Sequence, residues 1–234
     1  MKLKVLSWNI WFDNDFEKVC NFLKEFDADV VGCGEALPND PTRDIVSFMK
    51  GLGYHHILAP VVTLKKDGRI MSNALFSKYP IKESLIHILP DTKTDTRNMI
   101  QADIDIEGNA LHVFVTHLLH THQMPDPVQD SQVDKMLEIL PRENTIVMGD
   151  FNNTPESSII KKMREHFHDA QLDPIMTVDP NLFFGLGCST CKAEDFPMLR
   201  LDYIFTSSDM KASGLTVHPS SGSDHLPIST DIEI

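Results

Sequence analysis

The sequence predicts an α/β protein in which mixed sheets are covered on the outside by helices. Up to Gly53, apolar runs of strand length alternate with apolar residues at helical spacing. From Ile57 to Thr116 the apolar runs are all of strand length and are separated by turn residues. Both kinds of element bury their apolar faces economically when helices pack on the outer faces of sheets.

The opening is predicted to run strand, helix, strand, helix. Residues 3–10 form an apolar run of strand length, and residues 16–26 carry apolar side chains at helical spacing. Residues 29–33 have the composition of a second buried strand. Residues 45–52 repeat the helical spacing, and Gly53 follows where a helix would end.

The middle of the chain is predicted to be an antiparallel meander. Apolar residues alternate with acids over residues 101–106, and Glu107-Gly108-Asn109 supplies a hairpin turn into residues 110–116. The other strands expected in this region are residues 58–64, 72–77 and 84–89.

The last part of the chain returns to mixed elements. A helix is expected around Val133 to Leu140, and a second helix from about residue 156 to 167 has acids early and bases late. The strands expected here are residues 145–151, 201–206, 215–218 and 228–234.

Length and charge limit the classes of function. The 234 residues show no linker or repeat, so we expect one domain over residues 1–234. The N-terminus becomes polar too soon for a signal peptide, and no apolar run reaches membrane-spanning length, so we expect a cytoplasmic protein without a membrane span. The net charge of -13 opposes extended nonspecific binding to DNA.

The four cysteines favour reduced thiols. Cys20 and Cys33 lie in apolar contexts where a buried thiol is usual. Cys188 and Cys191 form a lone C-x-x-C without the second ligand pair that a structural zinc site normally has. The favoured interpretation of this pair is two ordinary thiols in a loop.

Polar residues gather where predicted strands end. Loops at strand ends are the places where a rigid scaffold presents catalytic groups. Asp202 differs, because it lies inside an apolar run and should therefore be buried and paired, with His225 as its candidate partner. The strand-end clusters are Asn9, Glu35, Thr116 with His117, Asp150 with Asn152, and Asp224 with His225.

The types of these residues suit a metal ion and a water molecule. Glu35 and Asn9 offer oxygen atoms to a hard cation such as Mg²⁺, which takes few protein ligands. Asp150 is able to accept a proton from an attacking water. Asn152 points to the same side as Asp150 if the extended backbone continues through Phe151, which then packs on the other side.

The remaining residues suit a developing negative charge on phosphorus. A buried Asp202 would hold His225 in one tautomer and favour its imidazolium form. His117 and Asn152 are able to donate hydrogen bonds to a phosphorane. Together these groups suit metal-assisted hydrolysis of a phosphoester.

Each residue also has an ordinary structural explanation. His117 fits a strand-end histidine, Glu35 a surface acid, Asn9 a turn former and Asp224 a cap, while Asp150 with Asn152 fits a capped strand-to-turn junction.

A second chemical hypothesis is a zinc-dependent hydrolase. His117, His120 and His122 lie within six positions, as ligands of one zinc ion do. The usual zinc-hydrolase run would continue with an acid and another histidine, whereas Gln123 and Met124 follow here.

Several short motifs, in this order, resemble the endonuclease/exonuclease/phosphatase (DNase I-like) superfamily. The resemblance extends from about Lys4 to the C-terminus and rests on the order and combination of the motifs. They are Ser7-Trp8-Asn9-Ile10, Gly34-Glu35, Thr96-Arg97-Asn98, Thr116-His117-Leu118, Gly149-Asp150-Phe151-Asn152, Arg200-Leu201-Asp202-Tyr203-Ile204 and Ser223-Asp224-His225-Leu226-Pro227.

The resemblance implies a four-layer α/β/β/α sandwich of two stacked mixed sheets and a Mg²⁺- or Mn²⁺-dependent phosphoesterase, most simply a phosphodiesterase. It places Asn9 and Glu35 at the metal site, with Asp224 assisting. The other positions that it implies are Asp150 as the acid that activates or orients the water, Asn152 and His117 at the phosphate, Asp202 and His225 as the Asp-His pair, and Arg97 facing the phosphate. The resemblance leaves open whether Asp150 or His225 is the base.

The resemblance is less specific within the superfamily. Residues 89–98 look somewhat like the 5′-tyrosyl-DNA phosphodiesterases, whereas Phe151 is shared with other branches. Gly34 replaces the usual Gln, and Cys191 after Thr190 replaces the usual aromatic residue. A catalytically silent binding module of the same fold is a further alternative, but all the expected polar positions are filled. The substrate class is left open between nucleic acid ends, lipid and sugar phosphates.

Overall fold

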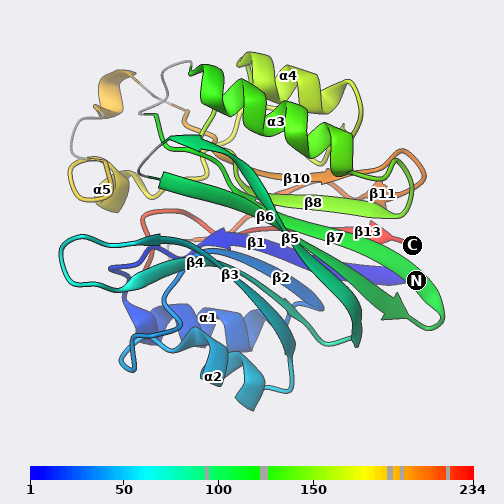
Figure 1. Cartoon of the computed structure of the whole chain (residues 1–234), viewed down its shortest axis with the longest axis horizontal. Coiled ribbons are helices and arrows are strands. Elements are labelled where there is room, and N and C mark those ends of the chain that lie inside the picture. Colours follow the sequence, from blue (N-terminus) through cyan, green and yellow to red (C-terminus); the bar gives the residue numbers. More distant parts are fainter. Residues whose placement is uncertain (93–94, 122–125, 189–191, 196–197, 220–221) are drawn as a thin grey trace.

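Two stacked β-sheets form the centre of the molecule, and helices cover the outer face of each. In the computed structural model, α1 (Phe16–Phe26) and α2 (Ile45–Gly51) lie below one sheet, and α3 (Pro127–Ile139) and α4 (Ser158–Arg164) lie above the other (Figure 1). The structure describes residues 1–92, 95–121, 126–188, 192–195, 198–219 and 222–234.

The first sheet holds the two ends of the chain side by side. Strands β1 and β2 are parallel, and every other pairing in this sheet is antiparallel. In spatial order the strands are β11 (Lys211–Ala212), β13 (Ile228–Glu233), β1 (Lys2–Asn9), β2 (Val30–Ala36), β4 (Ile70–Ser77) and β3 (His55–Thr63), with β12 (Thr216–Val217) also paired to β13.

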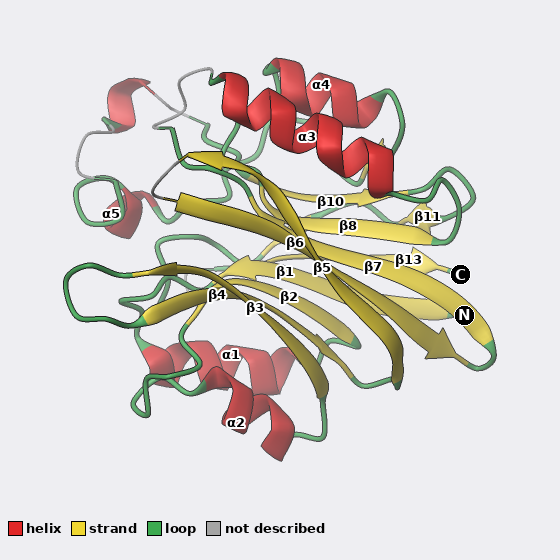
Figure 2. Ribbon diagram, in the orientation of Figure 1, coloured by secondary structure: helices red, strands yellow, loops and turns green. Residues whose placement is uncertain are grey.

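The second sheet is also mixed, with β7 and β8 parallel and the other pairs antiparallel. Two short helices, α5 (Pro180–Phe183) and the 3₁₀ turn Ala193–Asp195, lie beside its end. The spatial order is β5 (Ile81–Thr92), β6 (Asp95–Ile106), β7 (Asn109–His117), β8 (Thr145–Asp150), β10 (Asp202–Thr206) and β9 (His168–Asp169). The four layers of Figure 2 therefore confirm the α/β/β/α sandwich.

The antiparallel middle of the chain is divided between the two sheets and is not one meander. Strands β3 and β4 pair with β2 in the first sheet, whereas β5, β6 and β7 build the second. Tyr79-Pro80 connect the two groups, and Pro80 has no N–H to continue a strand ladder. The predicted turn at Glu107-Gly108 is present, with both residues at positive φ (53° and 90°) as a tight hairpin requires.

Three apolar layers hold the sandwich together. Val115 and Met148 of the second sheet belong to one cluster with Leu75 of the first, so the sheets pack directly face to face. Trp8 packs toward α1, and Phe151 belongs to the cluster under α3 and α4. Because these strands are buried on both faces, their sequences are nearly continuous runs of apolar residues.

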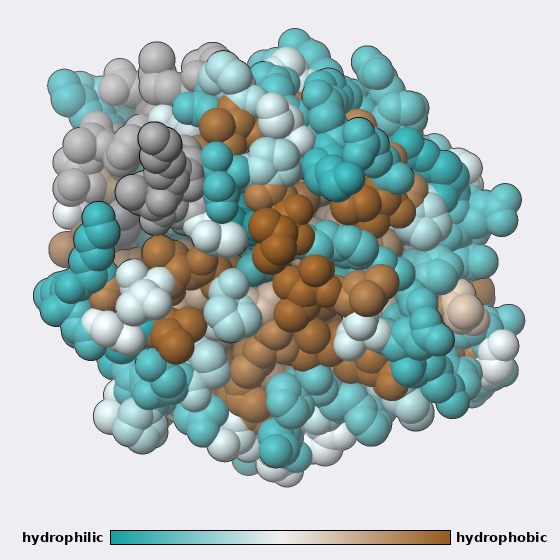
Figure 3. All heavy atoms as spheres, viewed as in Figure 1, coloured by the Kyte–Doolittle hydropathy of each residue, from teal (hydrophilic) through white to brown (hydrophobic). Residues whose placement is uncertain are grey.

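The outer edge of the second sheet carries exposed apolar residues. Leu85, Ile86 and Ile88 of β5 are exposed, and apolar side chains gather near the centre of the face in Figure 3, where β3, β5 and β6 lie in Figure 1. Among the described residues, none of the helices combines the length and the apolar character needed to cross a bilayer.

Candidate active site

Strand register brings the predicted polar residues to one edge of the sandwich. In the second sheet Asp150 is the register partner of both His117 and Asp202, so the three residues stand side by side at the ends of β7, β8 and β10. In the first sheet Asn9 stands beside Gly34, and Glu35 follows. Residues from distant parts of the chain meet because these strands end at the same edge.

A cavity of about 330 Å³ opens at this edge. Asp202 is the one predicted site residue that does not line it, because it contacts the far side of the His225 ring. The predicted residues in its lining are Asn9, Glu35, Arg97, His117, Asp150, Asn152, Asp224 and His225.

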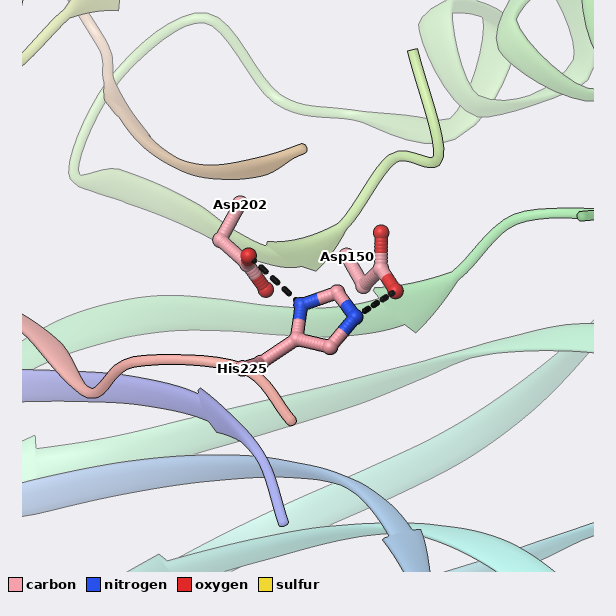
Figure 4. A group of neighbouring side chains, drawn as sticks. All are labelled: Asp150, Asp202 and His225. Carbon is pink, nitrogen blue, oxygen red and sulfur yellow. Dashed lines mark hydrogen bonds and ion pairs between the residues drawn. The ribbon is translucent and has the colours of Figure 1, made fainter. Parts of the chain in front are cut away.

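His225 lies between two carboxylates (Figure 4). Its Nδ1 is 2.8 Å from Asp202 Oδ2, and its Nε2 is 3.7 Å from Asp150 Oδ2. Burial alone would lower the pKa of His225, but Asp202 and Asp150 outweigh it and raise that pKa well above its usual value. His225 is therefore held as imidazolium.

Among the described residues, Asp150, Asp202 and His225 are the group whose donor atoms are close enough together to suit a metal ion. The short contact between His225 and Asp202 indicates a hydrogen-bonded chain, since this contact uses the Nδ1 atom that a cation would need.

His117, unlike His225, is held in its neutral form. Its Nε2 lies 3.5 Å from Asp150 Oδ2, and Arg97 donates a hydrogen bond of 3.4 Å to the His117 carbonyl. Burial, followed by the charges of Arg97 and His225, lowers the pKa of His117 well below its usual value. A neutral His117 is able to donate one hydrogen bond from a ring nitrogen while accepting at the other.

Acidic residues crowd the side of the cavity formed by the first sheet. The Asn9 amide nitrogen donates hydrogen bonds of 3.1 Å to both Glu35 Oε1 and Asp150 Oδ2. Burial raises the pKa of Asp150 to about 7, with His225 opposing the rise. Burial likewise raises the pKa of Asp224 to about 7, and the nearby charges of Glu35 and Asp150 add to that rise.

Residues with positive φ, and not regular extended backbone, aim several side chains at the cavity. Strand β8 ends at Asp150, and Asn152 has φ 51°, so the extended backbone does not continue through Phe151. The Asn152 side chain still reaches the cavity and donates a hydrogen bond of 3.0 Å to the Leu118 carbonyl. Glu35 and Trp11 also have positive φ, at 62° and 55°. Such conformations are costly and gather at functional sites.

A family model described as the Endonuclease/Exonuclease/phosphatase family matches residues 6–225. The chain belongs to this family.

Solved structures of the endonuclease/exonuclease/phosphatase family have the same fold at low sequence identity. An endonuclease/exonuclease/phosphatase from Beutenbergia cavernae DSM 12333 has a TM-score of 0.80 at 20% identity, over 100% of this chain and 72% of that one. The human Nocturnin catalytic domain gives 0.77 at 19%, over 99% and 93%. Humanized D. rerio TDP2 gives 0.70 at 18%, over 100% and 99%. No curated protein matches the chain.

One polar residue of the site, Thr177, was not predicted from the sequence. Thr177 donates a hydrogen bond of 2.7 Å to Asp202 Oδ2 and accepts from the backbone N–H groups of Leu201 and Asp202. Its apolar neighbours Met176 and Val178 gave no signal in the sequence. Thr190, which precedes Cys191 in the family resemblance, lies outside the described residues.

The histidine and cysteine predictions have different outcomes. His120 lines the cavity with His117, whereas His122, the third member of the zinc hypothesis, lies outside the described residues.

Cys20 and Cys33 are buried free thiols, as predicted. Cys188 is disulfide-bonded, so the prediction of an ordinary thiol was wrong there; Cys191 lies outside the described residues.

Proposed function

We propose that this protein is a divalent-cation-dependent phosphodiesterase that breaks a P–O bond by in-line attack of water. The observation that carries the proposal is the position of the Asp150 carboxylate. On the acidic side of the cavity this carboxylate accepts a hydrogen bond from Asn9. On the opposite side it lies beside His117 and His225. A group in this position is able to orient water between a cation and a phosphate.

The acidic side of the cavity fits a hard cation. Burial raises the pKa values of both Asp150 and Asp224, and the nearby carboxylates of Glu35 and Asp150 add to the rise for Asp224, so negative charge is costly on this side of the cavity. A divalent cation would offset that repulsion, and an all-oxygen donor set suits Mg²⁺ or Mn²⁺ better than softer metals. In this proposal Glu35 and Asp224 hold the cation, and Asn9 contributes through its amide oxygen.

The cation would supply Lewis-acid polarisation of the phosphate. Asp150, with its pKa near neutrality, accepts the proton of the attacking water. In this proposal His225, whose pKa is raised by the carboxylates of Asp202 and Asp150, is imidazolium and donates a hydrogen bond to developing negative charge, while Asp150 serves as the base. Arg97, His117 and Asn152 bind the phosphate oxygens.

Two of the similar structures agree with a phosphate site. The Nocturnin catalytic domain has a bound sulfate anion, which shares the tetrahedral shape and charge of phosphate. ANGEL2 is described as a 2′,3′-cyclic phosphatase and has a TM-score of 0.71 at 14% identity. The net charge of -13 favours a small or end-type phosphoester over a long duplex. The cytoplasmic location and the leaning toward 5′-tyrosyl-DNA phosphodiesterases stay predictions.

Hydrolysis of a phosphoester panel tests the proposal. The panel holds bis-p-nitrophenyl phosphate, a 5′-phosphotyrosyl oligonucleotide, abasic and plain duplex DNA, short RNA, sphingomyelin and an inositol phosphate. We expect cleavage of at least one diester with Mg²⁺ or Mn²⁺ and none with chelator. Cleavage that persists in chelator would contradict the cation dependence, and a folded protein that cleaves nothing would favour the silent binding module.

Metal analysis of the purified protein separates the zinc hypothesis. His117 and His120 share the cavity, so this alternative has one structural observation behind it. One tightly held zinc ion, lost in the His120→Ala/His122→Ala variant, would favour it over the proposed function.

A further inference from the structure

One side of the cavity is apolar and is not used by the chemistry proposed above. We call this side the apolar wall. It is supplied by the loop after β1 and by the β3–β4 hairpin. Its members are Trp11, Phe12, Val62, Leu64 and Met71.

Contacts between the loop and the hairpin fix the apolar wall. Val62 and Met71 are register partners in the β3–β4 pair. Arg69 of the hairpin donates a hydrogen bond of 2.9 Å to the Phe12 carbonyl, and its guanidinium lies 5.7 Å from the centre of the Phe12 ring. The Phe12 N–H in turn donates to Glu35 Oε2 at 3.2 Å. The apolar wall is therefore built at a fixed position relative to the acidic residues.

Trp11 is held in a backbone conformation that a bulky residue rarely adopts. Its φ is 55°. Its N–H donates to Asn9 Oδ1 at 3.1 Å, and its carbonyl accepts from Asn14 Nδ2 at 2.7 Å. This strained backbone conformation places the Trp11 indole at the cavity. Strain of this kind gathers where side chains contact ligands.

The charges beside the apolar wall are already paired. Arg69 forms ion pairs with Asp13 at 2.7 Å and with Asp67 at 2.9 Å, so its charge is compensated within the protein. Lys65 and Lys66 are exposed on the turn and do not belong to the cavity lining. A second phosphate or another charged group would therefore find no matched partner on this side.

We propose that the substrate is a phosphodiester in which one of the two alcohols is apolar, an aryl or short alkyl group that packs against the apolar wall. The inference rests on the proposed function. Water supplies the new oxygen on phosphorus, the P–O bond to one alcohol breaks, and that alcohol leaves with a proton. A cavity of about 330 Å³ is near the small end for ligand sites, so the apolar group is about the size of a single ring.

Binding of phosphonates tests this class without requiring turnover, because their P–C bonds are not hydrolysed. Calorimetric titration with Mn²⁺ present would compare methyl-, 2-hydroxyethyl-, propyl- and benzylphosphonate. The hydroxyethyl and propyl compounds have nearly the same shape, so they differ chiefly in polarity. We expect benzylphosphonate to bind about ten- to a hundredfold more tightly than methylphosphonate, and propyl- more tightly than 2-hydroxyethylphosphonate.

Two variants connect the preference to the apolar wall. Leu64→Ser should lower the ratio of benzyl to methyl affinity by about fivefold or more, whereas Leu172→Ser, a matched change at an exposed leucine outside this cavity, should leave that ratio unchanged. Trp11→Asn should also lower the ratio while keeping the melting temperature, because Asn tolerates positive φ better than Trp.

The outcomes separate this inference from the proposed function. Diester hydrolysis without any apolar preference, or a preference that survives Leu64→Ser and Trp11→Asn, would overturn the inference and leave the proposed function standing. A benzyl preference that these variants lower, in a protein that hydrolyses no diester, would support the apolar wall and contradict the proposed function.

Discussion

Thr177 Oγ1 donates a hydrogen bond of 2.7 Å to Asp202 Oδ2, the same oxygen that contacts the His225 ring. The Thr177 hydroxyl also accepts from the N–H groups of Leu201 and Asp202, at 3.0 and 3.2 Å. One buried hydroxyl therefore fixes both the backbone and the carboxylate that orient His225.

Thr177→Val should lower both activity and stability. Valine has nearly the same shape but leaves two buried N–H groups without an acceptor and the Asp202 carboxylate with His225 alone, which costs about 1–3 kcal/mol of unfolding free energy. Denaturant unfolding and kcat for a diester would measure the two effects. Thr177→Ser keeps the hydroxyl and should restore most of both, and equal loss in the Val and Ser variants would contradict this role.

Asp202→Ala should damage the site more severely. Asp202 is 1% exposed, and its removal leaves the buried His225 without the partner that keeps it charged. We expect a loss of about 3–5 kcal/mol in unfolding free energy together with loss of turnover. Thermal melting with a diester assay would measure this, and an unchanged melting temperature would show that the pair adds nothing to stability.

The dependence of cation binding on pH follows from the acidic residues. Burial raises the pKa values of Asp150 and Asp224 from 3.8 to about 7, so the folded protein keeps protons that the unfolded chain releases near pH 4. Without cation, this contribution to unfolding free energy is present below about pH 4 and is lost as pH rises through about 7. A cation should compensate the charges only once the protons are gone.

Mn²⁺ should therefore raise the melting temperature more at about pH 8 than at about pH 5. Calorimetric melts with and without Mn²⁺ at both values would measure the difference. Asp224→Asn should reduce the rise at the higher pH. A rise of the same size at both pH values would mean that these carboxylates do not hold the cation.

Gly149 should not tolerate a side chain. Its φ is 145°, and a Cβ there would overlap the carbonyl oxygen of Thr116 on the neighbouring strand. Gly149→Ala is expected to reduce unfolding free energy by several kcal/mol, of the order seen for strong core disruptions. Gly108→Ala is the matched control, because Gly108 also has positive φ (90°) but open space around it. Equal losses in the two variants would show that backbone strain, and not the overlap, sets the cost.

Sequence patterns predicted the edge of the sandwich where the site lies because apolar runs of strand length stop at polar residues. Asn9, His117 and Asp150 each end a strand in this way. The division of the middle strands between two sheets was not predictable, since the choice of sheet depends on pairing between distant segments. The positive φ of Asn152 was not predictable for a related reason, because it depends on tertiary contacts such as the hydrogen bond from the Asn152 side chain to the Leu118 carbonyl.

Asp150→Asn should remove the proton acceptor without unfolding the protein, although Asp150 is only 3% exposed. Burial raises the pKa of Asp150 to about 7, so its charged form is costly where no cation compensates it. Asn keeps an oxygen that is able to accept from the Asn152 N–H, and Asn9 loses its acceptor at Asp150 but keeps its hydrogen bond to Glu35, so the variant should still fold with a melting temperature close to that of the wild type.

The rate of bis-p-nitrophenyl phosphate hydrolysis by wild type and Asp150→Asn, each with Mn²⁺ and with chelator, tests the central claim most directly. We predict cation-dependent turnover in the wild type and a loss of about a thousandfold in the variant, with the melting temperature retained, because the amide cannot accept the proton of the attacking water. Wild-type turnover by Asp150→Asn would contradict the assignment of Asp150 and with it the proposed mechanism.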